Sequence, residues 1–511
     1  MSETFDAVVI GSGLGAATAG ALYAKAGHSV LMLERMESFG GAASRFIREG
    51  QVFETALHET TAPRDGDVKE EVFRALDLFD RVTFVPVPEL HEVRATALGA
   101  PFTLPHGYDA IAAAVADRFP QHAGAVRAFL DDLEHIRHLL SLTAHRGGLG
   151  WWVRHGPEIL SDLRHAGRDF GRSLSEMLDR HFGADETVKA ALVPNLAYYH
   201  DDPDRLWWTF FAVAQGEYYR HGGYFIRGGS TVLIRALLDV IRAAGGQTRA
   251  GRTVHEILLD AEGRAAGVVY HDSHGGLQTA RAPIVFAGCA PEQLADMLPA
   301  DRRAAFLAPY DGKTRSLTLM QASLALTRPA ADLGLTAYST VLVPDWMTGL
   351  RDLKDAAALI GDDPRPDRLP PLTVVDYGRI DAGLPGPGPA PVAVAALDRL
   401  DNWEGLSDAA YVARKTAWLD ALIGRLDREW PGFAQAVRLS DLATARTMAH
   451  WMGTPGGAVY GFAPDAPAGM PKPPTKVDTT IPGLFLASAW AGTGGFTGVM
   501  VGGKAAADAA L

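Results

Sequence analysis

The chain of 511 residues has a single cysteine, Cys289, and this scarcity excludes two kinds of chemistry. One thiol cannot form an intrachain disulfide, and it cannot supply the cysteine pair that thiol–disulfide exchange needs. Because Cys289 follows an apolar run at 284–288, we interpret it as a small core residue. The sequence also shows no His/Glu spacing typical of a metal site and no nucleophile elbow around a serine or cysteine.

Positive charge is also in short supply. The chain carries 48 Lys and Arg against 60 Asp and Glu, which gives a formal net charge of −12. Nucleic acid phosphates require a basic footprint, so we expect no nucleic acid partner. The same charge opposes electrostatic recruitment to anionic lipid, but it does not oppose hydrophobic contact with a membrane.

Long hydrophobic runs are missing as well. The most apolar aromatic stretch, 206–214, is far shorter than the roughly 20 residues that span a bilayer. No basic segment precedes the first expected strand, which starts at Phe5, so no targeting signal is indicated. We therefore expect a cytoplasmic protein. Peripheral contact with a membrane is an alternative, and Trp151-Trp152 would make that contact.

What the chain does have is a glycine-rich segment near each end. At the N-terminal end, an apolar strand at 5–10 is followed by a glycine loop, a helix at 14–26 and a second strand at 29–33. This βαβ order is typical of dinucleotide binding, since the helix start offers free N–H groups and a positive dipole end to phosphates. In the loop, Gly11 allows the tight turn and Gly13 lets a diphosphate approach the backbone; Leu14 and Gly15 follow.

An acidic residue completes this unit. Glu34 closes the second strand, about 20 residues beyond the loop, where a carboxylate can bind both hydroxyls of an adenosine ribose and repel a 2′-phosphate. Gly40-Gly41 comes next, either as bare backbone beside the diphosphate or as an ordinary turn. Arg45 lies just beyond, either as a phosphate partner or as a solvated surface charge.

The C-terminal segment repeats the pattern of strand, glycine loop and helix. An apolar strand at 484–487 leads to glycines at 492–495, and a helix is expected near Gly498. The N–H groups at its start would face an electron-rich group, and the flavin O2 oxygen fits because it gains negative charge on reduction. If the fold joins both segments, they can hold the two ends of one FAD.

Five motifs, spread over the whole chain, make it resemble the phytoene desaturase, carotenoid isomerase and retinol saturase superfamily of flavoproteins. They lie at 9–15, 33–41, 222–229, 454–462 and in the C-terminal glycine segment. The resemblance implies non-covalent FAD, a Rossmann-type FAD-binding domain of the two-dinucleotide, monoamine-oxidase-like α/β class, and a discontinuous mixed α+β substrate domain. It also implies a long apolar substrate.

The resemblance further implies which residues form the site. The segment that contains His58 would pass beside the flavin ring, where this histidine could shuttle a proton. Alternatively, His58 is a hydrogen-bonded structural histidine. Tyr460 would line the flavin face or simply pack. Besides the glycines of both loops and Glu34, the implied cofactor-binding residues are Arg35, Gly40, Gly41, Ala42, Ser44, Val254, Ala287, Trp490, Gly494, Gly495, Thr497, Gly498 and Val499.

Changes in composition along the chain predict two discontinuous domains. The FAD-binding domain would comprise 1–83, 220–307 and 441–511, and the substrate domain, a helical cap with a sheet, would comprise 84–219 and 308–440. The proline-rich stretch 364–391 is expected to be a surface loop.

The resemblance implies hydride exchange between the flavin and an allylic or olefinic carbon. We therefore expect an FAD-dependent oxidoreductase that desaturates or saturates a carotenoid, a retinoid or another polyene. The alternatives are a non-redox cis-trans isomerase, a flavin-binding protein without turnover, and an oxidase of amines. No second nucleotide fingerprint is present, so the electron acceptor would be oxygen, a quinone or an unknown partner.

Overall fold

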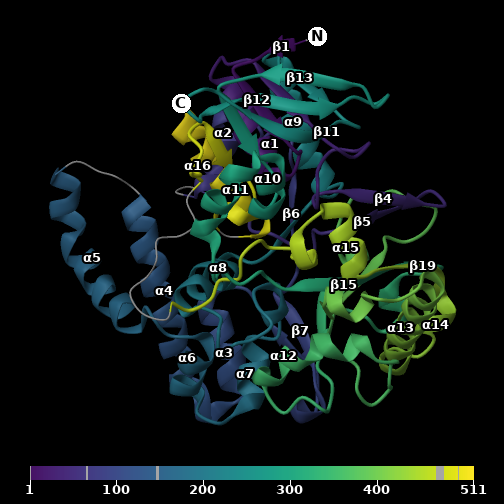
Figure 1. The fold of residues 1–511 in the computed structure, drawn as a ribbon. Coiled ribbons are helices and arrows are strands. Elements are labelled where there is room, and N and C mark those ends of the chain that lie inside the picture. The colour runs from purple at the N-terminus through teal and green to yellow at the C-terminus, as the bar shows by residue number, and fades with distance from the viewer. Residues whose placement is uncertain (1, 65–66, 145–148, 468–476, 493) are drawn as a thin grey trace.

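The computed structural model describes residues 2–64, 67–144, 149–467, 477–492 and 494–511. Both termini lie in one part of the molecule, built on a five-stranded sheet, and the other part combines a seven-stranded sheet with a layer of helices (Figure 1). The chain passes between the two parts several times.

The five-stranded sheet is parallel throughout and is assembled from segments far apart in the sequence. Its order is β10-β3-β2-β14-β20. The strands are β10 (Gln247–Arg249), β3 (Val30–Leu33), β2 (Ala7–Ile10), β14 (Ile284–Ala287) and β20 (Leu484–Leu486). β2 and β3 are buried along their whole length, as expected of parallel strands that are covered on both faces.

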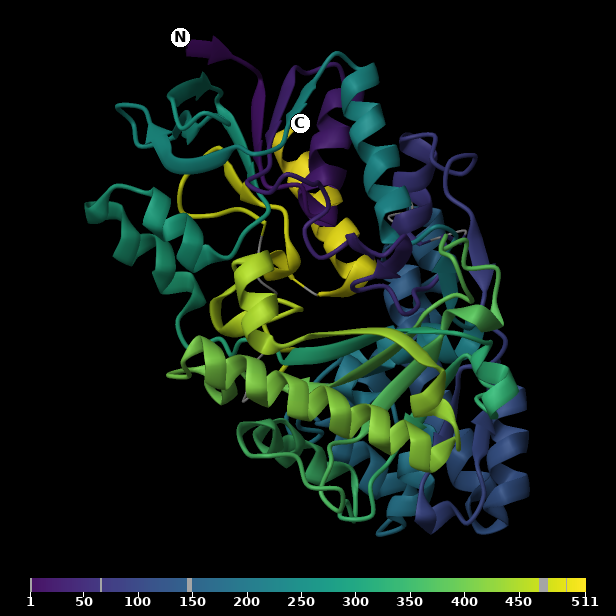
Figure 2. The ribbon, with the colours of Figure 1, turned by 90° about the vertical axis from the view of Figure 1, so that its right-hand side faces the viewer.

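Successive residues of β2 show how the two faces are covered. Ala7 and Val9 pack among the helices α1 (Leu14–Lys25), α9 (Ser230–Ala243) and α16 (Gly495–Ala510). Figure 2 shows α1 beside α16, with α9 nearby. Val8 and Ile10 pack on the opposite side, against a four-stranded sheet. Its order is β1 (Ser2–Thr4), β13 (Leu277–Arg281), β12 (Ala265–His271) and β11 (Thr253–Leu259).

The seven-stranded sheet is antiparallel except where β16 pairs with β7. Its order is β19 (Val437–Ala443), β15 (Thr318–Leu326), β18 (Val392–Asp398), β17 (Leu372–Asp376), β16 (Ser339–Leu342), β7 (His91–Arg94) and β8 (Phe102–Leu104). A separate core joins this sheet to α13 (Asp408–Glu429) and α14 (Phe433–Ala436).

A helical layer forms the rest of this part of the molecule (Figure 1). Its members are α3 (Tyr108–Arg118), α4 (Ala123–Ala144), α5 (Leu149–Asp169), α6 (Leu174–Phe182), α7 (Glu186–Leu192) and α8 (Trp208–His221). The remaining α-helices described are α2 (Val68–Ala75), α10 (Pro291–Met297), α11 (Ala300–Leu307), α12 (Leu353–Ala356) and α15 (Ala445–Met452). Two antiparallel two-stranded sheets complete the described fold: β4 (Arg45–Arg48) pairs with β5 (Gln51–Glu54), and β6 (Phe84–Pro86) pairs with β9 (Tyr224–Ile226). In the part of the chain that the structure describes, no helix combines the length and the hydropathy that a membrane span requires.

One expectation from the sequence is wrong. The proline-rich stretch 364–391 is not only a surface loop, because it contains β17, a fully buried strand inside the seven-stranded sheet. The run Leu-Thr-Val-Val-Asp fits a buried strand, and the prolines lie outside it, where no ladder hydrogen bond is lost. The division into two domains remains a proposal, and its boundary at residue 440 falls within β19.

Acid is expected to weaken the fold through His91. The ring is buried at the start of β7, and this burial lowers its pKa from 6.5 to about 3. Below pH 6.5 the unfolded chain therefore takes up a proton that the folded chain resists, so stability is lost as the pH falls. Urea unfolding at pH 7 and pH 5 should show a loss about 2 kcal/mol larger for the wild type than for His91→Leu. Equal losses would show that His91 is not held neutral.

Candidate cofactor site

Two helix starts from opposite ends of the chain meet in one place. α1 begins after Gly13 and α16 begins after Gly494, and no side chain caps either start. The helices lie so close together that a Cβ on Gly15 would be 3.0 Å from the Val499 carbonyl oxygen of α16, and the same Cβ would be 2.6 Å from the carbonyl oxygen of Ala487, which follows β20 (Figure 2). The free N–H groups of both first turns are therefore available to an electron-rich ligand.

The glycines beside these helix starts differ in their surroundings. Gly11 has a φ of +82° and donates its N–H to the Leu33 carbonyl, so it forms the tight turn. A Cβ on Gly13 would meet no protein atom within 4 Å, and the same is true of Gly495. A Cβ on Gly41 would lie 3.2 Å from the Gly13 Cα. The loop thus packs against Gly41 on one side and leaves open space where a Gly13 side chain would lie. This open space forms a cradle that fits a diphosphate.

Glu34 holds this loop in shape. Its buried carboxylate accepts hydrogen bonds from the Ser12 N–H at 2.9 Å and the Ser12 hydroxyl at 2.6 Å, and from the Met36 N–H at 2.9 Å. The Gly40 N–H donates to the same hydroxyl at 2.9 Å. Ser12 is a residue that the sequence analysis missed, although a small polar residue between two loop glycines was a usable signal.

The predicted residues at the adenosine side lie on or next to β3 and β14 of the five-stranded sheet and β11 of the four-stranded sheet. Ala287 is buried at the end of β14, and Val254 is buried near the start of β11. Arg35 follows β3, and its guanidinium donates to the carbonyls of His450 at 3.1 Å and Trp451 at 2.6 Å, in the last turn of α15. It therefore ties α15 to the cofactor loop, and its contact with the cofactor stays a prediction.

The predicted residues at the flavin side lie around the start of α16. Gly498 and Val499 are in its first turn, and the Thr497 hydroxyl lies 3.5 Å from that of Thr61. Trp490 is buried and packs edge-on against Phe462 with 4.9 Å between ring centroids. Ala42 is exposed, and the Ser44 hydroxyl lies 3.2 Å from that of Thr55. Arg45 is the first residue of β4. These assignments to the cofactor also stay predictions.

Glu54 explains one glycine of the 222–229 motif, Gly229. Its carboxylate, buried at the end of β5, accepts from the Ser230 N–H at 2.9 Å and from the Ser230 hydroxyl at 2.7 Å. It also accepts from the N–H groups of Ala56 and Leu57. A Cβ on Gly229 would lie 2.4 Å from this carboxylate. The motif therefore lets a buried acid cap α9, a role that the sequence analysis did not assign.

His58 and Tyr460 border the same region. The His58 Nδ1 and the Tyr198 hydroxyl form a hydrogen bond of 2.7 Å. Burial lowers the pKa of His58 to about 4, so the ring is neutral at pH 7. The Tyr460 backbone packs against Gly494, where a Cβ would lie only 2.5 Å from the Tyr460 Cβ, and burial raises the pKa of its phenol to about 12. Their catalytic roles remain predictions.

A second buried acid follows His58. Burial raises the pKa of Glu59 to about 8, which the Tyr218 hydroxyl offsets in part, so this carboxyl holds its proton at neutral pH. Cys289 is half-buried and packs against the core, and burial raises the pKa of its thiol to about 12. Among the residues that the structure describes, no group of three or more His, Cys, Asp or Glu could hold a metal ion.

Comparisons with known proteins extend this picture. The family of NAD(P)-binding Rossmann-like domains matches residues 9–76. An all-trans-retinol 13,14-reductase from Macaca fascicularis is 23% identical over 100% of this chain and 86% of its own length. The Rattus norvegicus protein of the same name is 27% identical over 52% of this chain, and that match covers only 44% of its length.

Two further relatives are named as a phytoene desaturase and a prolycopene isomerase. The phytoene desaturase (neurosporene-forming) of Cereibacter sphaeroides is 28% identical over 52% of this chain and 50% of its own length. Prolycopene isomerase 1 of an Oncidium hybrid cultivar is 24% identical over 99% of this chain and 84% of its own length. These relatives support the resemblance of the chain to this superfamily of FAD-dependent oxidoreductases.

Solved structures confirm the α/β fold. An oxidoreductase from Methanosarcina mazei superposes with a TM-score of 0.62 at 17% identity and covers 99% of both chains. Cyclohexylamine oxidase from Brevibacterium oxydans superposes with a TM-score of 0.57 at 14% identity, and the match covers 99% of this chain and 98% of that protein. Together with the open cradle at Gly13, the two uncapped helix starts and the buried Glu34, these comparisons support FAD as the cofactor.

Proposed function

We propose that the protein is an FAD-dependent oxidoreductase that desaturates or saturates carbon–carbon bonds of a hydrophobic polyene or isoprenoid. The observation that carries this proposal is the bipartite cradle of α1 and α16, in a chain whose relatives are named as retinol reductases and a phytoene desaturase. FAD, when bound, supplies hydride transfer. The chain's own residues supply the binding, the orientation and the exclusion of water.

The groups around His58 support an apolar substrate. At pH 7 His58 is neutral, since burial lowers its pKa to about 4, and burial raises the pKa of Tyr198 and Tyr460 above their ordinary values. Glu59 is protonated under the same conditions. These groups therefore present no charge to a hydrocarbon, and the site is suited to a reaction that needs a dry surrounding.

Anaerobic spectroscopy tests the proposal. The chain purified with FAD should be yellow, and its flavin, reduced with dithionite, should be reoxidised by a polyene such as retinol if the protein saturates double bonds. In the opposite direction, the oxidised flavin should be bleached by phytoene. A chain that takes up no FAD, or a flavin that responds to neither substrate, would overturn the proposal.

The prolycopene isomerase relative, which aligns with 99% of this chain, favours one alternative. A cis-trans isomerase would convert its polyene with reduced FAD and without net use of electrons. Counting electrons separates the two, because an oxidoreductase consumes one equivalent of a two-electron acceptor or donor for each carbon–carbon bond changed.

We propose oxygen or a quinone as the electron acceptor. Peripheral membrane contact and a cytoplasmic location stay predictions. The side chain of Trp152, one of the two residues expected to make that contact, lies outside the described residues.

A further inference from the structure

An apolar cavity of about 320 Å³ lies between the seven-stranded sheet and the helical layer. One wall is formed by β15, β16, β17 and β18, and the facing wall by α7 and the short helix η3 (Leu196–Tyr198). Its lining includes Leu319, Val341, Ala395 and Leu196. The volume is at the lower end of the range of about 300–1,000 Å³ that small-molecule sites occupy, so the cavity suits a slender ligand.

The charges of the lining select against one class of ligand. Glu186 and Asp345 are its only charged residues, and no Lys, Arg or His lines the cavity within the described chain. Lys189 pairs with Glu186 at 2.6 Å, whereas Asp345 accepts a hydrogen bond from the Thr96 hydroxyl at 2.6 Å. An anionic ligand would therefore lose its hydration without forming an ion pair with a cationic side chain. The exposed carboxylate of Asp345 would also repel it.

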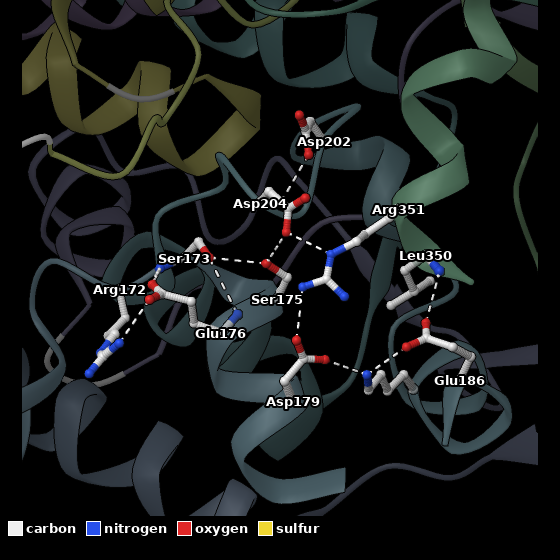
Figure 3. A network of polar contacts seen from close by, with 11 residues as sticks. Arg172, Ser173, Ser175, Glu176, Asp179, Glu186, Asp202, Asp204, Leu350 and Arg351 are labelled. Atoms are coloured by element: carbon white, nitrogen blue, oxygen red, sulfur yellow. Dashed lines mark hydrogen bonds and ion pairs between the residues drawn. The ribbon is translucent and has the colours of Figure 1, made fainter. Parts of the chain in front are cut away.

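Polar contacts hold the outer wall in place (Figure 3). The Glu186 carboxylate accepts from the Leu350 N–H at 3.2 Å. The Arg351 guanidinium then donates to Asp179 and to Asp204, both at 2.8 Å. These bonds join the segment that follows β16 to α6 and α7. The cavity is therefore built into the fold, and it does not depend on a loose loop.

The inner end is marked by Tyr198. Tyr198 lines the cavity, and its hydroxyl is hydrogen-bonded to His58 at 2.7 Å. Neither His58 nor Tyr460 lines the cavity. Tyr460 lies against Gly494 at the start of α16, and it is close enough to Tyr198 to influence its pKa. Tyr198 thus stands between the apolar cavity and the flavin side of the cofactor site.

We propose that this cavity receives the uncharged isoprenoid chain of the substrate, that it rejects carboxylates and diphosphates, and that Tyr198 is the positioning residue that limits how far the chain reaches toward the cofactor. The identity of the ligand as a substrate rests on the proposed function. Binding itself does not, so the two ideas can fail separately.

The fluorescence of bound retinol provides the assay, with geranylgeraniol, geranylgeranoic acid and farnesol as competitors and with FAD-saturated protein. The alcohol should compete at least about tenfold more strongly than the acid of the same length. Ala190→Phe, which fills the cavity from α7, should weaken retinol binding at least about tenfold, whereas Ala410→Phe on the exposed face of α13 should not. Asp345→Lys replaces a negative charge with a positive one, so the ratio of the affinity for geranylgeraniol to that for geranylgeranoic acid should fall.

Chain length tests the role of Tyr198. Tyr198→Ala should deepen the cavity and shift the preference from farnesol toward geranylgeraniol by about fivefold, whereas Tyr198→Phe keeps the ring and should keep the wild-type preference. A merely structural tyrosine would lower both affinities together. Equal binding of acid and alcohol, unchanged binding in Ala190→Phe, or an unchanged length preference in Tyr198→Ala would overturn the inference.

The outcome for the proposed function is read separately. Retinol binding that Ala190→Phe abolishes, without any change of the flavin spectrum, would support the cavity and refute the redox reaction. Flavin reoxidation by retinol that Ala190→Phe leaves intact would support the redox reaction and refute the cavity.

Discussion

Gly13→Val is expected to give a folded protein that no longer binds FAD. Gly13 has a φ of −58° and a ψ of 158°, which valine also adopts, and no protein atom lies within 4 Å of the added Cβ. The side chain would therefore occupy only the space that we assign to the diphosphate. FAD affinity should fall at least about 100-fold, or about 2.7 kcal/mol, measured by fluorescence titration of the apoprotein.

Gly15→Val is the matched control for this substitution. Its Cβ would lie 2.6 Å from the Ala487 carbonyl oxygen and 3.0 Å from that of Val499, so it would force α1 and α16 apart. Urea unfolding of the apoprotein should lose about 3 kcal/mol or more for Gly15→Val, and less than about 0.5 kcal/mol for Gly13→Val. If Gly13→Val retains FAD, or if it destabilises the apoprotein as Gly15→Val does, then the space in front of Gly13 is not the diphosphate site.

Glu54→Ala is expected to cost about 3 kcal/mol in the free energy of unfolding. The substitution removes the cap of α9 and leaves the N–H groups of buried Ser230 and Leu57, and that of exposed Ala56, without their acceptor. Urea denaturation at constant FAD concentration measures the loss. Glu54→Gln retains one acceptor oxygen and should lose less.

The control for Glu54→Ala is Glu262→Ala, in an exposed turn, where the change should stay within about 0.5 kcal/mol. A Glu54→Ala variant as stable as the wild type would show that Gly229 serves another purpose. In that case the close approach of Gly229 to the carboxylate would need a different explanation.

The N-terminal unit could be predicted closely because its signals are local. The sequence placed strands at 5–10 and 29–33 and a helix at 14–26, and the structure has β2, β3 and α1 there. Apolar β-branched runs, glycines and a terminal acid each act within a few residues of where they stand. By contrast, the buried strand β17 was hidden by the prolines that flank it.

The polar contacts of the site could not be predicted because their partners are distant in the sequence. Glu54 and Ser230 are separated by 176 residues, and His58 and Tyr198 by 140. No periodicity or spacing links such pairs, and only the fold brings them together. The same holds for Arg35, which was assigned to the cofactor from its place after Glu34 and which the structure joins to the carbonyls of α15.

A structure of the full chain with FAD bound tests the central claim most directly. We predict the diphosphate against Gly13 and the start of α1, the adenosine ribose on Glu34, and the flavin ring at the start of α16, near His58 and Tyr460. A flavin placed away from α16, or a diphosphate that does not contact the loop of Gly11–Gly15, would contradict the conclusion that the two ends of the chain form one cofactor site.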